Sequence, residues 1–241
     1  MTILAIETST TVCAAALISE GAVLAERTLN EPHLHSEKLL TLVDSVLSGN
    51  RTRPDAVAVS IGPGSFTGLR IGLSVAKGLC FAWETPLIPV PTLHALAWNS
   101  IHYSIGEEGD YVLPLLDARR NEVYAALYQR LSGDMIELLP ARAMSFEASF
   151  ELLRDNYRTV VLGEASGKFM DAALDRPLKA RQMIAATTEQ RQCSAASVGI
   201  VGERMLNEGV RAETASLEPM YLKDFVPLVQ PQRMVIDHGM V

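Results

Sequence analysis

An internal repeat is the feature that most constrains the fold of this chain. Residues 6–7 (Ile-Glu) align with residues 116–117 (Leu-Asp), and the apolar run 15–17 aligns with 125–127 at the same offset of 110 residues. In each copy, short apolar runs separated by polar turns predict three antiparallel strands, followed by a helix, a further strand and a second helix. The strands predicted at the start of the two copies are 3–6, 12–18 and 22–29, and then 112–118, 123–128 and 135–139. We therefore predict a duplicated α/β unit, an arrangement that commonly places a ligand crevice between the copies.

Helical periodicity and turn residues predict the remaining elements. In the first copy these are helices 36–48, 66–82 and 93–101 and strands 57–61 and 86–91. The second, shorter copy continues with a helix at 146–153 and a strand at 159–163. A helix at 194–208 follows the stretch 175–192, which is polar and which we predict to be irregular. Because residues 106–110 are acidic and rich in glycine, we place the domain junction there. The predicted units are an N-terminal lobe (1–105, completed by helix 194–208), a smaller C-terminal lobe (106–222) and a tail (223–241).

Composition limits the classes of function. The 241 residues are 48% apolar, enough to bury a core, and a net charge of -7 argues against a protein that holds nucleic acid alone. The cysteines at positions 13, 80 and 193 are far apart and have apolar neighbours, which indicates a reducing compartment. The N-terminal residues lack the features of a secretory signal, and no stretch reaches the ~18 consecutive apolar residues of a membrane span. We therefore expect a cytoplasmic protein that does not cross a membrane.

The run Gly62-Pro63-Gly64-Ser65-Phe66-Thr67-Gly68 joins a predicted strand to a predicted helix. It has neither the Gly-Lys-Ser/Thr of a Walker A motif nor the flanking residues of a G-x-S-x-G nucleophile elbow. Two interpretations remain open: free amides at the helix start bind an anion, or the glycines allow a tight turn and close packing. The hydroxyl-rich turn after the first strand is a second candidate for holding a nucleotide phosphate. The candidate residues of a vestigial nucleotide site are Glu7, Thr8, Ser9, Gly62, Gly64 and Ser65.

Two predicted helices carry wide apolar arcs. At 100° per residue the arc of helix 36–48 spans roughly 160° and that of helix 66–82 roughly 200°. In the second helix Arg70, Ser74 and Lys77 form the polar stripe. A helix of this kind is sandwiched within its own domain or covered by another chain. The predicted partner-binding residues are Leu39, Leu42, Val43, Val46, Leu47, Leu69, Leu73, Ala76, Leu79 and Cys80.

The histidines do not suggest a metal site. His33 and His35 lie two positions apart, which is not the spacing of paired helical ligands, and we assign both to a solvated loop before the first helix. No metal ligand set is predicted from the sequence.

Four segments together resemble the bacterial TsaB family (formerly YeaZ) of tRNA threonylcarbamoyladenosine biosynthesis. They are Ala5-Ile6-Glu7-Thr8-Ser9, His35-Ser36-Glu37 with Leu39-Leu40, the run from Gly62 to Gly72, and Glu218-Pro219-Met220-Tyr221-Leu222. The resemblance spans nearly the whole chain. It implies an α/β fold with two RNase-H-like lobes of the actin, sugar-kinase and Hsp70 (ASKHA) class, the second lobe being shortened.

The resemblance also implies a function. It implies a non-catalytic scaffold that binds and activates its paralogue TsaD, which carries the metal and the transferase chemistry, with the ATPase TsaE as third member. The TsaD family holds its metal with a His-x-x-x-His pair, whereas here His35 is followed four positions later by Leu39. The implied reaction adds the threonylcarbamoyl group to adenosine 37 of tRNAs that read ANN codons.

Further expectations follow from the same resemblance. The protein has no catalytic residue, metal or cofactor of its own beyond weak ATP or ADP binding in the complex, meets tRNA only through the complex, and forms a homodimer when alone. One alternative is a nucleotide-binding hydrolase or transferase of the ASKHA class. Another is a peptidase that acts on the paralogue, although the chain shows no activated nucleophile for it.

Overall fold

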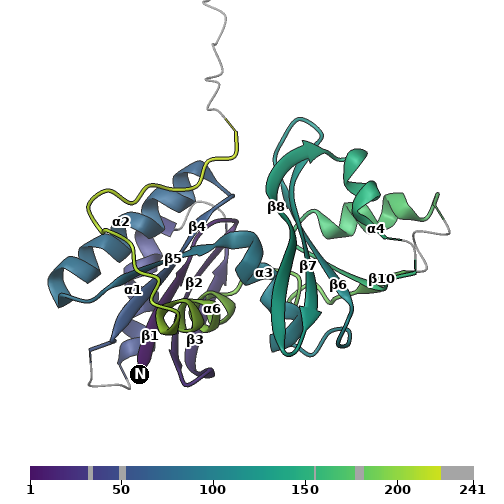
Figure 1. Cartoon of the computed structure of the whole chain (residues 1–241). Helices are drawn as coiled ribbons and strands as arrows, with labels where there is room; N and C mark the ends of the chain where they lie inside the picture. Colours follow the sequence, from purple (N-terminus) through teal and green to yellow (C-terminus); the bar gives the residue numbers. More distant parts are fainter. Residues whose placement is uncertain (32–34, 49–52, 155, 177–181, 224–241) are drawn as a thin grey trace, which may run out of the picture.

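The computed structural model describes residues 1–31, 35–48, 53–154, 156–176 and 182–223. Within these ranges the chain forms two lobes that lie side by side, each built on a five-stranded mixed sheet (Figure 1). No helix in the described ranges has the length and apolar character needed to cross a bilayer.

The N-terminal strand lies at the centre of the sheet of the first lobe. Its strands are β1 (Thr2–Glu7), β2 (Val12–Ser19), β3 (Ala22–Asn30), β4 (Ala56–Gly62) and β5 (Leu87–Pro91), in the order β3-β2-β1-β4-β5. The first three strands are antiparallel, with Ile6 opposite Ala15, whereas β4 runs parallel to β1, with Ile6 opposite Val59. Side chains of β1 alternate between the two faces of the sheet, so that both faces require a cover.

Helices cover both faces of this sheet. One face carries α1 (His35–Leu47) and α2 (Phe66–Trp83), and their apolar side chains share a core with Leu4 and Ile6. The other face carries α6 (Ala195–Asn207), which packs with Ile3 and Ala5 although it lies far away in the sequence. Helix α6 therefore returns to the first lobe after the chain has formed the second.

The second lobe repeats the plan of the first. Its strands are β6 (Tyr111–Asp117), β7 (Glu122–Leu131), β8 (Asp134–Ser145), β9 (Thr159–Leu162) and β10 (Met183–Ala185), in the order β8-β7-β6-β9-β10. Read from β8, this order matches that of the first sheet strand by strand. The predicted fold class and its internal duplication are confirmed. A short 3-10 helix, η1 (Ala148–Leu152), and α4 (Ser166–Ala173) cover one face, where the rings of Phe146, Phe150 and Phe169 pack together.

Several predicted elements differ from the observed ones. The helix expected at 146–153 is the five-residue η1, and the strand expected at 135–139 extends to Ser145 as β8. Strand β10 lies inside the stretch 175–192, which we predicted to be irregular. These differences concentrate in the second lobe, where the covering elements are short and periodicity is correspondingly weak.

Helix α3 (Thr92–His102) joins the two lobes (Figure 1). It packs against β4 and β5 on one side and against strands of the second sheet on the other. His94 stacks on Tyr128 of β7 with ring centroids 5.4 Å apart, and the indole N–H of Trp98 donates to Nε2 of His94 over 3.2 Å. A single hydrophobic core therefore runs from β1 through α3 into the second sheet.

Candidate functional site

The turn after β1 is buried beneath the predicted glycine loop. Glu7, Thr8 and Ser9 have no exposed surface. The amide and the hydroxyl of Ser9 both donate to Oε1 of Glu7 over 2.5 Å. The hydroxyl of Thr8 donates to the carbonyl oxygen of Gly68 over 2.9 Å. The turn is therefore tied to itself and to the start of α2, and not presented to a ligand.

Three glycines make this contact possible. A Cβ atom on Gly64 would lie 2.3 Å from the carbonyl oxygen of Ser9, and one on Gly68 would lie 2.1 Å from the carbonyl oxygen of Thr8. On Gly72 it would lie 2.2 Å from Oγ1 of Thr8. Each distance is far inside van der Waals contact, so any larger residue would push α2 away from β1. These contacts favour the packing interpretation of the glycine loop.

The loop amides that an anion would need are partly occupied. The amide of Gly62 donates to Oγ1 of Thr92, that of Ser65 to the carbonyl of Ser9, and that of Gly68 to Oγ of Ser65. Of the predicted nucleotide-binding residues, Gly62 is buried with the turn residues, Gly64 is half-buried and Ser65 is exposed as the N-cap of α2. The structure thus brings all six predicted residues together, but as a packed junction.

Burial disfavours the charged forms of the titratable side chains in and near this junction. Burial raises the pKa of Glu7, and the hydrogen bonds from Ser9 offset that effect only in part. Burial also raises the thiol pKa of Cys13 and Cys80 to about 11 and holds that of Cys193 well above its ordinary value. The thiolate, which is the nucleophilic form, is therefore disfavoured at all three cysteines.

A small cavity of about 190 Å³ lies between the lobes next to this turn. Residues 10–12 line it from the first lobe and Leu116 and Glu164 from the second, together with Arg191 and Cys193. Pockets for small-molecule ligands usually measure about 300–1,000 Å³. This cavity is below that range.

His35 differs from the prediction. It is the first residue of α1, it is buried, and its Nε2 lies 3.1 Å from the carbonyl oxygen of Thr10 and 3.0 Å from that of Val12. The assignment to a solvated loop is wrong for His35, because its ring ties α1 to the β1–β2 turn; His33 lies outside the described residues. Among the described residues, no three His, Cys, Asp or Glu side chains converge as a metal site.

The predicted partner-binding residues are mostly core residues. Eight of the ten are buried within this chain: Leu39, Leu42, Val43, Val46, Leu69, Leu73, Ala76 and Cys80. Leu47 and Leu79 are half-buried against the same core. The two apolar arcs thus cover the chain's own sheet, and a contact with another chain must use other residues of these helices.

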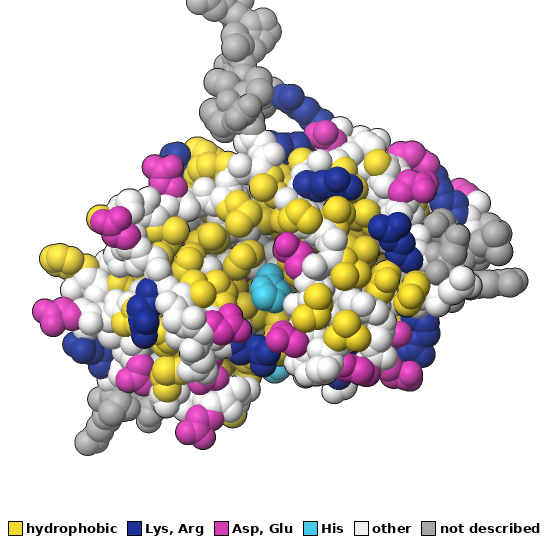
Figure 2. All heavy atoms as spheres, viewed as in Figure 1, with side chains coloured by type: hydrophobic (Ala, Val, Ile, Leu, Met, Phe, Trp, Pro, Cys, Tyr) yellow, Lys and Arg dark blue, Asp and Glu magenta, His cyan; other side chains and the backbone are white. Residues whose placement is uncertain are grey.

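The surface of α2 has a composition that we did not predict. Its exposed residues are Thr67, Arg70, Ser74, Gly78, Phe81 and Ala82, and Ile71 between them is half-buried against the core. Arg70 is the one charged residue among them, and Phe81 is 88% exposed. Leu40 of α1 is a further exposed apolar side chain, 58% exposed. On the face shown in Figure 2, hydrophobic side chains also spread over the first lobe and the junction between the lobes, with charged side chains scattered around them.

The segment 213–222 lies along one flank of α2, and we name it the strap. The amide of Met220 donates to the carbonyl of Ile61 over 2.7 Å, and the ring of Tyr221 stacks on that of Phe66 at 5.2 Å. Arg70 lies over the Phe66 ring and donates from Nε to the hydroxyl of Tyr221 over 3.0 Å. The motif at 218–222 is therefore anchored by packing against α2 and the end of β4.

Solved structures of other proteins place the fold in a class. A ROK hexokinase from Thermus thermophilus superposes with a TM-score of 0.51 at 12% identity, over 87% of this chain and 100% of that chain, a likeness of fold alone. YeaZ from Pseudomonas aeruginosa superposes with a TM-score of 0.74 at 27% identity, over 92% of this chain and 99% of that chain. The fold is the two-lobed α/β fold of the actin and sugar-kinase class, built here around a packed junction.

Sequence comparisons identify the family. The family model described as TsaD, tRNA N6-adenosine threonylcarbamoyltransferase, matches residues 22–229. The tRNA threonylcarbamoyladenosine biosynthesis protein TsaB of Bacillus subtilis is 34% identical over 164 residues, covering 67% of this chain and 69% of that protein. The TsaB protein of Escherichia coli is 41% identical over 133 residues, covering 54% of this chain and 56% of that protein. The chain belongs to the TsaB (YeaZ) family.

Proposed function

We propose that this protein is a non-catalytic scaffold subunit in tRNA threonylcarbamoyladenosine biosynthesis, which binds and activates the catalytic paralogue TsaD. The names of its relatives support the process, and the match to the TsaD family model supports a paralogous partner of the same fold. The observation that carries the scaffold role is the exposed side of α2, on which Ser74, Gly78 and Ala82 are small and uncharged and Phe81 is almost fully exposed.

Gly78 has no role in the packing of this chain. A Cβ atom at this position would meet nothing within 4 Å, and its φ is not in the left-handed region. A glycine in the interior of a helix costs about 1 kcal/mol relative to alanine. In contrast to Gly64, Gly68 and Gly72, it gives this chain no close contact in return. A second helix that packs closely on α2 explains the absence of a side chain.

The residues around Gly78 fit the same interpretation. Ser74, Gly78 and Ala82 follow one another at four-residue intervals, which forms a shallow groove into which side-chain ridges of another helix pack. Phe81 borders this groove and is almost fully exposed. Large exposed aromatic residues beside small ones are typical of the centre of a protein interface.

The chain's own polar groups support a non-catalytic role. Glu7, Thr8, Ser9 and His35 are committed to the packing between the β1–β2 turn, α1 and α2. The cavity between the lobes is small for a nucleotide. We therefore propose that the protein brings no cofactor of its own, that nucleotide chemistry belongs to TsaE and TsaD, and that tRNA binds through the complex. With a net charge of -7, this chain is a poor match for the phosphate backbone by itself.

The structure changes which variants test the interface. Substitution of Leu73 or Val43 by Arg would place a charge in the core, so loss of binding would report unfolding. Phe81→Asp avoids this problem, because the side chain is exposed. Leu174→Asp is the matched control: it exchanges another exposed apolar residue, 74% exposed, on the second lobe.

We expect Phe81→Asp to abolish co-purification with TsaD from the same organism and to weaken binding at least ~100-fold by calorimetry, a loss within the hot-spot range. Leu174→Asp should leave binding within ~2-fold of the unmodified protein. Equal binding by both folded variants would contradict the proposed interface. In the absence of TsaD, we propose that the same face binds a second copy of this chain.

A further inference from the structure

The turn between β6 and β7 has a strained backbone. Arg119, Arg120 and Asn121 all lie in the left-handed region, with φ of 64°, 54° and 60°. Glycine adopts this conformation freely and asparagine tolerates it, whereas a longer L side chain is strained there. The β2–β3 and β7–β8 turns each use a glycine, Gly21 and Gly133, for one of their two left-handed residues. The β6–β7 turn instead keeps two arginines where their side chains lower stability.

The repeat does not require this conformation. The corresponding turn of the first lobe, between β1 and β2, consists of residues 8–11, all described, and none of them lies in the left-handed region. Its first residues, Thr8 and Ser9, are buried against α2, whereas Arg119 and Arg120 are exposed. Strained residues that the fold does not demand are concentrated at functional sites. The two arginines therefore point to a ligand of the second lobe.

Both guanidinium groups are available to a ligand. Among the described residues, neither Arg119 nor Arg120 forms an ion pair, although the carboxylate of Glu164 acts electrostatically on Arg119. The exposed Lys168 of α4 adds a third cation, because its Nζ lies 3.4 Å from Oδ1 of Asn121. A guanidinium carries five N–H donors in a fork that fits two oxygens of one oxyanion. The turn thus offers two such forks side by side.

The acids beside the turn hold its shape. Oδ1 of Asp117 accepts the amide of Arg119 over 2.8 Å. Glu122 forms an ion pair with Lys223, which also donates from Nζ to the carbonyl of Ala118 over 2.7 Å. The turn is therefore fixed at both ends, and these two carboxylates are already used within the chain.

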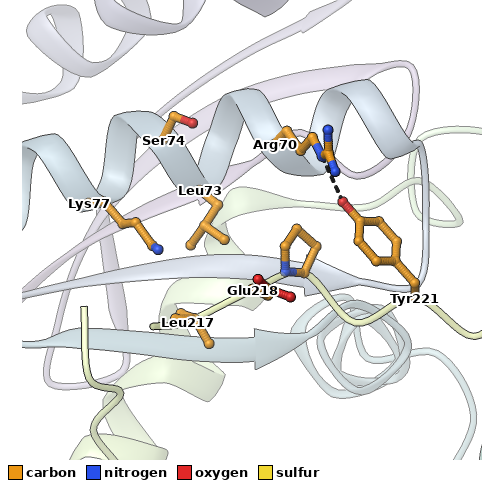
Figure 3. A pocket seen from close by; sticks show the side chains of 8 residues that line it. Arg70, Leu73, Ser74, Lys77, Leu217, Glu218 and Tyr221 are labelled. Carbon is orange, nitrogen blue, oxygen red and sulfur yellow. Dashed lines mark hydrogen bonds between the residues drawn. The ribbon is translucent and has the colours of Figure 1, made fainter. Parts of the chain in front are cut away.

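The strap places the turn beside α2. Figure 3 shows the hydroxyl of Tyr221 meeting Arg70 in the first turns of α2. Lys223, two residues after Tyr221, contacts the β6–β7 turn of the other lobe. The cations of this turn are therefore tied to the same helix on which we propose that TsaD binds.

We propose that the β6–β7 turn binds the sugar-phosphate backbone of RNA, with Arg119 and Arg120 each contacting a phosphate group and Lys168 adding positive charge. The inference rests on the proposed function, which brings this chain next to tRNA in the complex with TsaD. It agrees with the net charge of -7, because two arginines on one turn attract phosphate locally without making the whole chain a strong nucleic-acid binder.

The surroundings of the turn favour RNA over a protein partner. Within residues 117–122 the one apolar side chain, Ala118, is buried. The centre of a protein interface is apolar, whereas phosphate contacts need only charged and polar donors. Contacts to phosphate position an RNA without reading its sequence. We therefore expect the turn to add affinity that does not depend on the bases beside it.

The test measures tRNA binding by the complex of this chain with TsaD from the same organism. Fluorescence anisotropy with a labelled tRNA transcript, between about 50 and 200 mM salt, compares the unmodified chain with the double variant Arg119→Gly/Arg120→Gly. We expect the dissociation constant to rise at least ~10-fold at about 100 mM salt. The slope of log affinity against log salt should become shallower by ~1.5, because each lost phosphate contact removes roughly 0.7–0.9.

The glycine variant is its own folding control. Glycine relieves the strain of the left-handed conformation, so the melting temperature should not fall. Arg119→Lys/Arg120→Lys keeps both charges and loses the forks, so it should retain the salt slope. Arg27→Gln/Arg211→Gln is the matched control: it removes two exposed cations from the first lobe and should leave the affinity within ~2-fold.

Three results would overturn the proposal. The first is an unchanged dissociation constant and salt slope in the folded glycine variant. The second is an equal loss in the matched control, which would assign the effect to net charge. The third is weaker binding of TsaD by the glycine variant with an unchanged salt slope for tRNA, which would make the turn a protein contact.

The outcome is separable from that of the proposed function, because calorimetry of the chain with TsaD precedes the tRNA titration. If Phe81→Asp still binds TsaD while the glycine variant loses tRNA, the scaffold surface is wrong and the RNA site stands. If the unmodified chain does not bind TsaD, the proposed function fails, and the isolated chain is titrated with the same transcript at about 50 mM salt. Equal affinity of the unmodified chain and the glycine variant in that titration would also overturn the RNA site.

Discussion

Replacement of Gly78 by alanine should change the stability of the chain and the affinity of the complex in opposite directions. Within the chain, the added methyl group meets nothing within 4 Å and the residue already lies in a regular helix. The intrinsic gain from glycine to alanine is about 1 kcal/mol. For a protein of this size that gain raises the melting temperature by roughly 2–4 °C.

In the complex, the same methyl group should weaken binding. If a helix of TsaD packs closely over Gly78, a Cβ atom there overpacks the contact, which typically costs about 1–3 kcal/mol. At about 1.4 kcal/mol per factor of ten, the dissociation constant should rise roughly 5-fold to 150-fold. Gly78→Gln, which is longer but equally uncharged, should weaken binding further.

The assay combines thermal unfolding of the isolated chain with calorimetric titration of TsaD. Gly78→Ala is its own folding control, because a more stable chain that binds less well cannot be explained by unfolding. Ala82→Gly supplies the reverse comparison on the same face, since it lowers helix stability and enlarges the groove. A stabilised Gly78→Ala protein with unchanged affinity would refute the close helix contact and with it the argument that Gly78 serves a partner.

Three further predictions concern the junction and the core. Gly68→Ala should destabilise the fold by about 3 kcal/mol or more, seen as a melting temperature lower by roughly 6–12 °C, because its Cβ would lie 2.1 Å from the carbonyl of Thr8; a change below ~1 kcal/mol would disprove the contact. Burial raises the pKa of Glu7, so above pH 4.5 the folded state keeps the proton of this carboxyl group while the unfolded state releases it. The unfolding free energy of the unmodified protein should therefore fall as pH rises from that value. Glu7→Gln should remove this slope in urea unfolding series, and an unchanged slope would contradict the burial argument. Asn99→Ala should cost about 3 kcal/mol or more, because the buried amide donates to two carbonyls over 2.8 and 2.7 Å and accepts from Ser197 over 2.6 Å; equilibrium unfolding measures it, and a loss under ~1 kcal/mol would count against this role.

The sequence predicted best those strands and helices whose hydrophobic pattern extends over many residues. Three consecutive strands near each start and an offset of 110 residues between the copies were enough to predict that one α/β unit occurs twice, and the two sheets share one strand order. Strand β10 was not predicted, and helix α4 was implied only by the repeat, without bounds, because three strand residues and eight helical ones give too short a pattern. In place of the helix predicted at 146–153 the chain forms the five-residue η1, and Phe150 in it packs against the ring of Phe146.

The sequence predicted that α1 and α2 are covered helices, but not which side of each helix faces the chain's own sheet. A wide apolar arc shows that α2 is covered, yet it cannot show which part faces the chain's own sheet. Leu73 and Val43 are the most apolar choices for an interface, and the sheet buries both. The informative signal was the opposite one, the uncharged small residues at 74, 78 and 82, which hydrophobicity alone does not reveal. His35 was misassigned for a related reason, since the carbonyls that it binds are distant in the sequence.

The junction between the lobes supports a rigid scaffold. Two-lobed proteins that close on a ligand do so at hinges of a few residues that change their backbone angles. Here the stack of His94 on Tyr128 lies within one core, and Arg204 of α6 forms an ion pair with Asp134 of β8 over 2.6 Å. Closure would have to break these contacts between α3, α6 and the second sheet. We therefore expect the two lobes to move as one body, so that a partner bound at α2 would leave the spacing between the lobes unchanged.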